Sequence, residues 1–157
     1  MIDGVEVYPL SRREDERGWF VELMRFSNLP QQVKQSNLVF SRQGVIRGLH
    51  YHERGQSDLF ACLTGMVRIV VLDRQSGETF TVDIGDDNPV AVYIPGGHAH
   101  GFEALTDLLF CYHVTEEYDP ADPDEHEIPW DDPRVKQLWS TSSPILSGRD
   151  EAAAASS

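Results

Sequence analysis

Short runs of β-branched, aromatic and aliphatic residues recur along the 157-residue chain, separated by turn residues. Such residues favour strands, and Gly, Pro, Asn and Asp favour the turns between them. No stretch long enough for a major helix keeps an apolar period of 3.6 residues. The pattern therefore predicts eight strands, over residues 5–10, 19–24, 37–41, 59–63, 66–73, 79–84, 91–95 and 108–114.

Many short strands without alternating helices are typical of an all-β sandwich, jelly roll or barrel and not of a parallel α/β sheet. Short helices are expected near residues 26–32 and 133–138. We expect one domain over residues 1–150, with the acidic segment 116–133 folded over the barrel mouth. Residues 151–157 (EAAAASS) are expected to form a disordered tail.

The net charge of −13 argues against nucleic acid as a partner, because phosphate backbones bind clustered Lys and Arg. It allows an anionic nucleotide ligand, since a few local arginines can outweigh the global field. Cys62 and Cys111 lie inside apolar runs and are expected to be small buried side chains, with no disulfide. Without a signal peptide or a run of membrane-spanning length, we expect a cytoplasmic protein with no membrane partner.

Four of the six histidines occur in two short patches, RGLHYH with His50 and His52, and PGGHAHGF with His98 and His100. Residues two apart in a strand point to the same face, so His50 and His52 are expected to share one face inside the barrel. Glycines surround both patches, as expected where the backbone bends or closely approaches a ligand. The arrangement favours a functional cluster over four separate structural histidines.

These patches belong to a longer series of motifs that resembles the dTDP-4-dehydrorhamnose 3,5-epimerase family. The order and approximate spacing match from about Val5 to Asp150, and RGLH followed by P-x-G-x-A-H-G-F is the most specific part. The resemblance is carried by DERGWFVE (15–22), Gln35 and Asn37, GVIRGLHYH (44–52), IPGGHAHGF (94–102), YHVTEEYDP (112–120), IPWDDP (128–133) and LSGRD (146–150).

The resemblance implies a cupin-type jelly-roll barrel that forms homodimers, with an N-terminal strand paired to the partner subunit. It implies an epimerase that removes and replaces protons at C3 and C5 of a nucleotide-linked 4-keto-6-deoxyhexose, without a cofactor. His50 would be the base, Asp150 would hold and polarise it, and Tyr112 would be the acid on the opposite face of the sugar.

The resemblance also implies a set of substrate-binding residues. Arg47 and His100 would line the sugar and phosphate pocket, and Arg17 and Glu22 would meet the nucleotide across the dimer interface. Gln35, Asn37 and Tyr118 complete the set.

The chemistry of the reaction is consistent with these roles. A hydrogen next to a ketone becomes acidic only as far as the enolate is stabilised, so the site needs a base and an oxyanion partner. A neutral histidine with a carboxylate behind it suits the base, and inversion needs a proton donor on the other face. The planar fork of an arginine such as Arg47 suits a diphosphate.

One segment departs from the family's pattern. His52 stands where glutamine is usual, and Asp58 stands where the family carries a lysine placed to stabilise the enolate oxygen. A second negative charge there would oppose enolate formation. The change also produces a series of His50, His52, Asp58 and His100 that is similar to the metal-binding motifs of cupins. Such a set suits a divalent transition metal, although His50 could not act as the base while it is bound to the metal.

Three functions therefore remain open. The first is the nucleotide-sugar epimerase, which acts at C3, C5 or both. The second is a metal-dependent cupin acting as an oxygenase or isomerase on a small molecule. The third is a non-catalytic protein that binds a sugar nucleotide.

Overall fold

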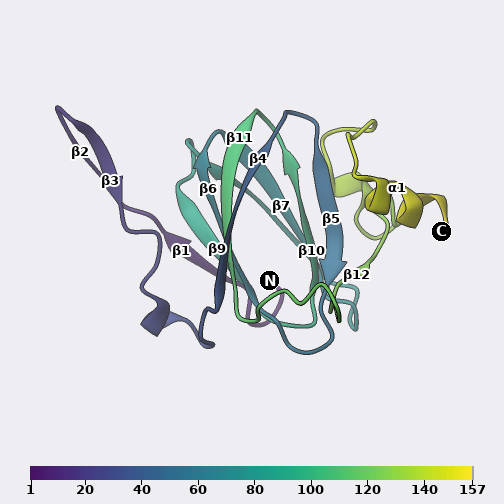
Figure 1. Ribbon diagram of the computed structural model, residues 1–157. Coiled ribbons are helices and arrows are strands. Elements are labelled where there is room, and N and C mark those ends of the chain that lie inside the picture. The colour runs from purple at the N-terminus through teal and green to yellow at the C-terminus, as the bar shows by residue number, and fades with distance from the viewer. Residues whose placement is uncertain (157) are drawn as a thin grey trace.

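The computed structural model describes residues 1–156 as two five-stranded antiparallel sheets that face each other, together with a two-stranded hairpin (Figure 1). The first sheet has the spatial order β1 (Glu6–Pro9), β9 (Val90–Ile94), β6 (Asp58–Thr64), β11 (Leu108–Val114) and β4 (Gln35–Ser41). The second has the order β12 (His126–Glu127), β5 (Ile46–Tyr51), β10 (Ala99–Ala104), β7 (Met66–Leu72) and β8 (Thr79–Gly85). The hairpin pairs β2 (Arg12–Asp15) with β3 (Gly18–Val21).

The main core lies between the two sheets. Phe60 and Phe110 from the first sheet pack with Ile69 and Phe102 from the second, and each is at most 5% exposed. Burying an aliphatic or aromatic side chain of this size stabilises the fold by about 1.5–3 kcal/mol. The predicted all-β jelly-roll barrel is therefore confirmed, and its core holds the two sheets at a fixed separation.

The outer face of the second sheet is covered by the C-terminal segment. Leu49 and Val70 of the sheet pack against Val135 and Trp139, and all four are buried. The buried carboxylate of Glu103 accepts hydrogen bonds from the backbone N–H of Ser140, at 2.7 Å, and from the Ser140 hydroxyl. These contacts hold the segment that leads to the last helix.

The N-terminal part of the chain is arranged differently. Part of it packs on the outer face of the first sheet, where Leu10 lies against Leu59 and Tyr93. The β2–β3 hairpin then extends away from the barrel on the side opposite the C-terminal helix (Figure 1). Its aromatic residues Trp19 and Phe20 are exposed.

Each of the eight predicted runs overlaps a strand, and residues 1–156 contain four further strands. Of these, β5 and β10 interrupt their apolar residues with glycine and histidine, which hides their period. The two predicted short helices are single 3-10 turns, η1 (Phe26–Asn28) and η2 (Lys136–Leu138).

The predicted disordered tail is wrong for residues 151–155, which belong to helix α1 (Gly148–Ala155). The side chain of Ser147 caps this helix by accepting a hydrogen bond from the N–H of Asp150. Acidic residues in the first turn favour the helix dipole, and the alanine run has high helix propensity. Ser157 lies outside the described residues.

Neither cysteine forms a disulfide. Cys62 is buried and Cys111 is partly buried. Burial raises the pKa of the Cys62 thiol to about 11, which makes it unreactive. Among residues 1–156, no helix is both long and apolar enough to cross a membrane.

Candidate active site

A cavity of about 620 Å³ opens inside the barrel and gathers five of the residues predicted for catalysis or substrate binding. They come from both sheets and from the C-terminal helix, and they are His50 and Arg47 of β5, His100 of β10, Tyr112 of β11 and Asp150 of α1. The cavity has the dimensions of a small-molecule site.

Asp150 lies directly behind the imidazole of His50. Its Oδ1 is 2.9 Å from His50 Nε2, and its other oxygen is 3.4 Å from the N–H of Gly48. Burial acts to raise the pKa of Asp150, but the hydrogen bond and charge of His50 outweigh it, so the pKa lies below its ordinary value. When Nε2–H donates to this carboxylate, Nδ1 of His50 carries the lone pair that a base needs.

A close approach of two glycines sets the positions of His50 and His100. These histidines are paired across β5 and β10, and the register shifts directly after His100. A Cβ added at Gly48 would come within 2.8 Å of Gly101 Cα, and one added at Gly101 within 2.6 Å of the Arg47 carbonyl oxygen. The glycines predicted to mark a bend or a ligand contact therefore allow two strands to meet.

Tyr112 contributes a hydroxyl to the same cavity. Its ring lies edge-on to Phe60, with 6.1 Å between the ring centroids. Burial raises the pKa of Tyr112, and the negative charges of Asp58 and Glu125 raise it further. The phenol therefore stays protonated at neutral pH and can donate a proton.

Arg149 also lines the cavity, and sequence reasoning missed it. Its Nη2 is 2.9 Å from His50 Nε2, its Nη1 is 2.5 Å from Glu125, and its Nε is 2.9 Å from Glu127. The one feature of the sequence that could have identified Arg149 as a site residue is its position next to Asp150 in LSGRD. The same helix turn thus brings a carboxylate and a cation to His50 Nε2. Because arginine can only donate, its Nη2–H forms no hydrogen bond with Nε2 in the tautomer in which Nε2–H donates to Asp150.

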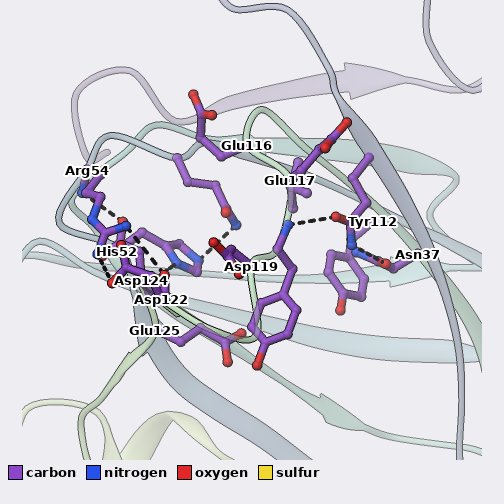
Figure 2. Close-up of a pocket in the computed structure, with 14 residues that line it drawn as sticks. Asn37, His52, Arg54, Tyr112, Glu116, Glu117, Asp119, Asp122, Asp124 and Glu125 are labelled. Atoms are coloured by element: carbon purple, nitrogen blue, oxygen red, sulfur yellow. Dashed lines mark hydrogen bonds and ion pairs between the residues drawn. The ribbon is translucent and has the colours of Figure 1, made fainter.

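A second pocket of about 390 Å³ adjoins the first and shares His52 and Tyr112 with it. Gln35, Asn37 and Tyr118 line this pocket, where Gln35 donates to Asn37 at 2.9 Å and accepts from the N–H of Tyr118 at 2.8 Å. Figure 2 shows Asn37 and Tyr112 on one side of the pocket and His52 on the other. The acidic segment predicted to cover the barrel mouth supplies much of the remaining lining.

Arg17 and Glu22 line neither cavity. Arg17 follows β2 on the exposed hairpin and pairs with Asp15 at 2.5 Å, while Glu22 follows β3 and pairs with Arg25 at 2.8 Å. A single chain therefore does not bring these two predicted residues to the others.

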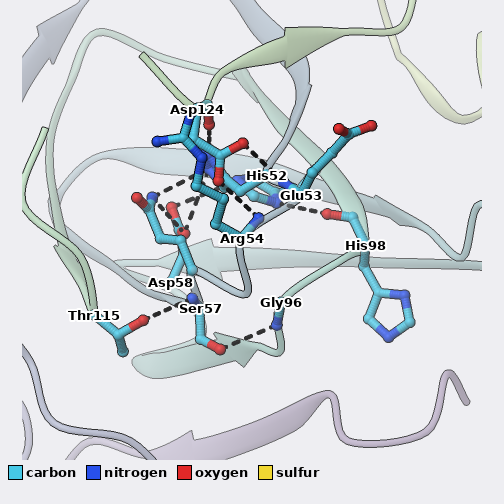
Figure 3. Close-up of polar contacts among 11 residues, drawn as sticks. His52, Glu53, Arg54, Ser57, Asp58, Gly96, His98, Thr115 and Asp124 are labelled. Atoms are coloured by element: carbon cyan, nitrogen blue, oxygen red, sulfur yellow. Dashed lines mark hydrogen bonds and ion pairs between the residues drawn. The ribbon is translucent and has the colours of Figure 1, made fainter. Parts of the chain in front are cut away.

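Three of the four residues predicted as metal ligands form one cluster, and the fourth does not belong to it. His52, Asp58 and His100 are buried, and their ligand atoms lie within 4.8 Å of one another. His50 is not in this group, because it pairs with Asp150 instead. The ring of His98 is directed away from the cluster (Figure 3) and lies 3.9 Å from Asp73.

Asp58 and His100 shift each other's pKa toward the charged forms. Burial acts to raise the pKa of Asp58, but His100, His52 and Gln56 lower it below its ordinary value. Burial acts to lower the pKa of His100, but the Asp58 carboxylate raises it above its ordinary value. Burial and the charge of His100 lower the pKa of His52.

The jelly-roll barrel and its enclosed histidine, carboxylate and tyrosine define a cupin-type protein with an acid–base pocket, and the comparisons specify it further. A sequence model of the dTDP-4-dehydrorhamnose 3,5-epimerase family matches residues 1–156. The spore coat polysaccharide biosynthesis protein SpsL of Bacillus subtilis is 42% identical over 149 residues, which cover 90% of this chain and 98% of that protein.

Two crystal structures are similar over 96% of this chain. NovW, a 4-keto-6-deoxy sugar epimerase from Streptomyces spheroides, has a TM-score of 0.86 at 33% identity, with 81% of its chain covered. The epimerase RmlC of Legionella pneumophila, in complex with dTDP-4-keto-L-rhamnose, has a TM-score of 0.86 at 31% identity, with 87% covered. The chain therefore belongs to the dTDP-4-dehydrorhamnose 3,5-epimerase family and is a carbohydrate epimerase. The metal-dependent oxygenase and the non-catalytic binder are not favoured.

Proposed function

We propose that this chain epimerises a nucleotide-linked 4-keto-6-deoxyhexose, with His50 as the base and Tyr112 as the acid. The single observation that carries the proposal is the cavity in which His50, held by buried Asp150, and the Tyr112 hydroxyl both lie. Their geometry and the motifs that they occupy support these proposed roles.

In the proposed reaction, His50 removes the proton from a carbon next to the C4 ketone. The electron pair moves to the carbonyl oxygen and forms an enolate, and Asp150 stabilises the imidazolium that results. Tyr112 then delivers a proton to the same carbon from the other face, which inverts the centre. Return of the proton from His50 to the tyrosinate, directly or through solvent, completes the cycle.

A thymidine diphosphate sugar is the proposed substrate. NovW and RmlC are named for 4-keto-6-deoxy and dTDP-linked sugars, and the RmlC structure holds dTDP-4-keto-L-rhamnose. Arg47 lines the sugar cavity, where its Nε donates to the Ser41 hydroxyl at 3.0 Å. Its Nη2 donates to the carbonyl oxygen of Phe40 at 3.4 Å. The N–H groups outside these two contacts are suited to diphosphate oxygens.

A homodimer is part of the proposal. The hairpin exposes Trp19 and Phe20, and the outer face of the β4 edge strand exposes Leu38 and Phe40. Exposed apolar side chains on an edge strand and a projecting hairpin are expected to be covered by another chain. Pairing the hairpin with a second copy would carry Arg17 toward that copy's nucleotide.

The test is proton exchange followed by NMR. Incubated in deuterium oxide with the thymidine diphosphate 4-keto-6-deoxyglucose substrate, the enzyme should incorporate deuterium at C3, C5 or both. A His50→Asn variant that melts at the wild-type temperature serves as the control. Absence of exchange at both carbons with folded, dimeric protein would contradict the proposal.

The pattern of labelled carbons also decides between single and double epimerisation. The predicted cytoplasmic location stays a prediction, which cell fractionation would test.

A further inference from the structure

Three buried side chains from three separate segments meet at one wall of the cavity. His52 directly follows β5, Asp58 begins β6, and His100 lies in β10. Their exposed fractions are 5%, 3% and 6%. Asp58 Oδ1 is 3.8 Å from His52 Nε2, and Asp58 Oδ2 is 3.4 Å from His100 Nε2. The reaction proposed above uses neither His52 nor Asp58.

Both histidines are held from behind by backbone carbonyls. His52 Nδ1 is 2.6 Å from the carbonyl oxygen of Asp124 (Figure 3). His100 Nδ1 is 3.1 Å from the carbonyl oxygen of His98. A carbonyl can only accept, so each Nδ1 carries the proton. Metal-binding histidines show this arrangement, because it orients the ring and leaves the Nε2 lone pair free for the metal.

The amide of Gln56 already indicates where a cation would lie. Its nitrogen is 3.1 Å from His52 Nε2 and 3.2 Å from Asp58 Oδ1, so it donates toward both ligand atoms. Among residues 1–156, no lysine or arginine forms an ion pair with Asp58. The buried carboxylate therefore relies on the two histidines and one neutral amide.

We propose that His52, Asp58 and His100 bind one divalent first-row transition cation. Two imidazoles and one carboxylate suit Zn²⁺, Fe²⁺, Co²⁺, Ni²⁺ or Mn²⁺, whereas Mg²⁺ and Ca²⁺ prefer all-oxygen sites. Metal–ligand bonds of about 2.0–2.2 Å place neighbouring ligand atoms roughly 3–3.5 Å apart. The two distances from Asp58 to the histidines are close to that spacing. Rotation of the imidazoles would bring the ligand nitrogens of His52 and His100 to the same spacing, since all the ligand atoms lie within 4.8 Å of one another.

The three-residue site leaves His50 free to act as a base. The competition between ligation and catalysis that a four-residue site would create is therefore removed. When bound, the cation would add positive charge to the cavity wall at the position where the family carries lysine. Only this last consequence rests on the proposed function, because binding itself depends on the three side chains.

The same three groups also have a metal-free state. With His52 neutral, a second proton on His100 makes an imidazolium beside the Asp58 carboxylate, and the cluster is then neutral overall. A measurement of binding therefore has to distinguish a cation from that proton.

The experiment is a titration of chelator-treated full-length protein with Co²⁺ and, by calorimetry, with Zn²⁺. We expect one saturable site per chain and a visible Co²⁺ absorption band typical of mixed nitrogen and oxygen ligands. Asp58→Asn and His52→Gln should each weaken binding by at least about tenfold. His98→Gln, which changes a nearby histidine whose ring points away, should bind like the wild type.

Melting curves would show that each variant is folded. Absence of saturable binding to the folded wild type would overturn the proposal, as would equal binding by wild type, Asp58→Asn and His52→Gln. Either result would leave the epimerase proposal intact, since deuterium exchange by the chelator-treated enzyme is measured separately.

Discussion

The cavity and the β2–β3 hairpin are built from opposite kinds of contact. In the cavity, the ion pair of His50 with Asp150 joins residues 100 positions apart, and Asp150 is buried. In the hairpin, Arg17 pairs with Asp15 two positions away, and both side chains are exposed. The cavity is therefore assembled by the tertiary fold, and the hairpin is organised by its own sequence.

This difference indicates which predicted residues one chain can place. Exposed local ion pairs contribute little to stability, because solvent screens them, so they do not fix where the hairpin points. Buried contacts between β5, β10 and α1 do fix His50, because leaving Asp150 without a partner would cost much more. One chain supplies the residues that line the cavity, whereas the proposed ligand contacts of Arg17 and Glu22 would require a second copy.

The largest expected effect comes from removing the proposed base. His50→Asn should lower kcat/KM by about 10³-fold, within the range for loss of a general base. Steady-state kinetics on folded protein would measure this. A His98→Asn control, which changes a ring outside the cavity, should keep wild-type kinetics; a His50→Asn enzyme as active as that control would rule out this base.

Loss of the Tyr112 hydroxyl should have a somewhat smaller and more specific effect. Tyr112→Phe keeps the ring against Phe60 and should lower the rate of inversion by about 10²-fold. Because His50 can still remove and return a proton on its own face, deuterium uptake should persist with retained configuration. Equal losses of exchange and inversion, followed by NMR, would argue that Tyr112 is not the acid.

The next prediction concerns the β2–β3 hairpin and its proposed contact with the nucleotide. Arg17→Ala should raise KM for the nucleotide sugar by about tenfold, as expected for loss of one exposed charged contact, and should leave kcat nearly unchanged. A matched Arg13→Ala variant on the same hairpin should leave both constants near wild type. A Phe20→Ser variant that becomes monomeric in size-exclusion chromatography should show the same rise in KM.

The smallest predicted effect concerns stability at acid pH. The pKa of Asp150 is lowered in the folded state, so the stability that it contributes is present above its ordinary value of 3.8. That stability is lost as the pH falls through the lower, folded pKa. Unfolding measured from pH 6 to pH 2 should show a shallower acid limb for Asp150→Asn than for the wild type.

The sequence predicted the strands rich in apolar residues but not β5 and β10, which carry His50 and His100. Runs such as residues 66–73 and 108–114 are mostly apolar and correspond to β7 and β11. Glycine and histidine interrupt β5 and β10, and only the close approach of Gly48 to Gly101 explains why glycines are needed there. The tail was misjudged because the Ser147 cap and the burial of Asp150 matter more than its terminal position.

By itself, the sequence determined the all-β class, the enclosed histidines and the family motifs, because these depend on local periodicity and residue identity. Only the tertiary structure decided that Arg149 contacts His50, that His98 points away, and that Asp58 joins His52 and His100 without His50. These arrangements depend on the packing of β5, β6, β10 and α1. Contacts between residues so far apart in the chain have no signature in the spacing of any one segment.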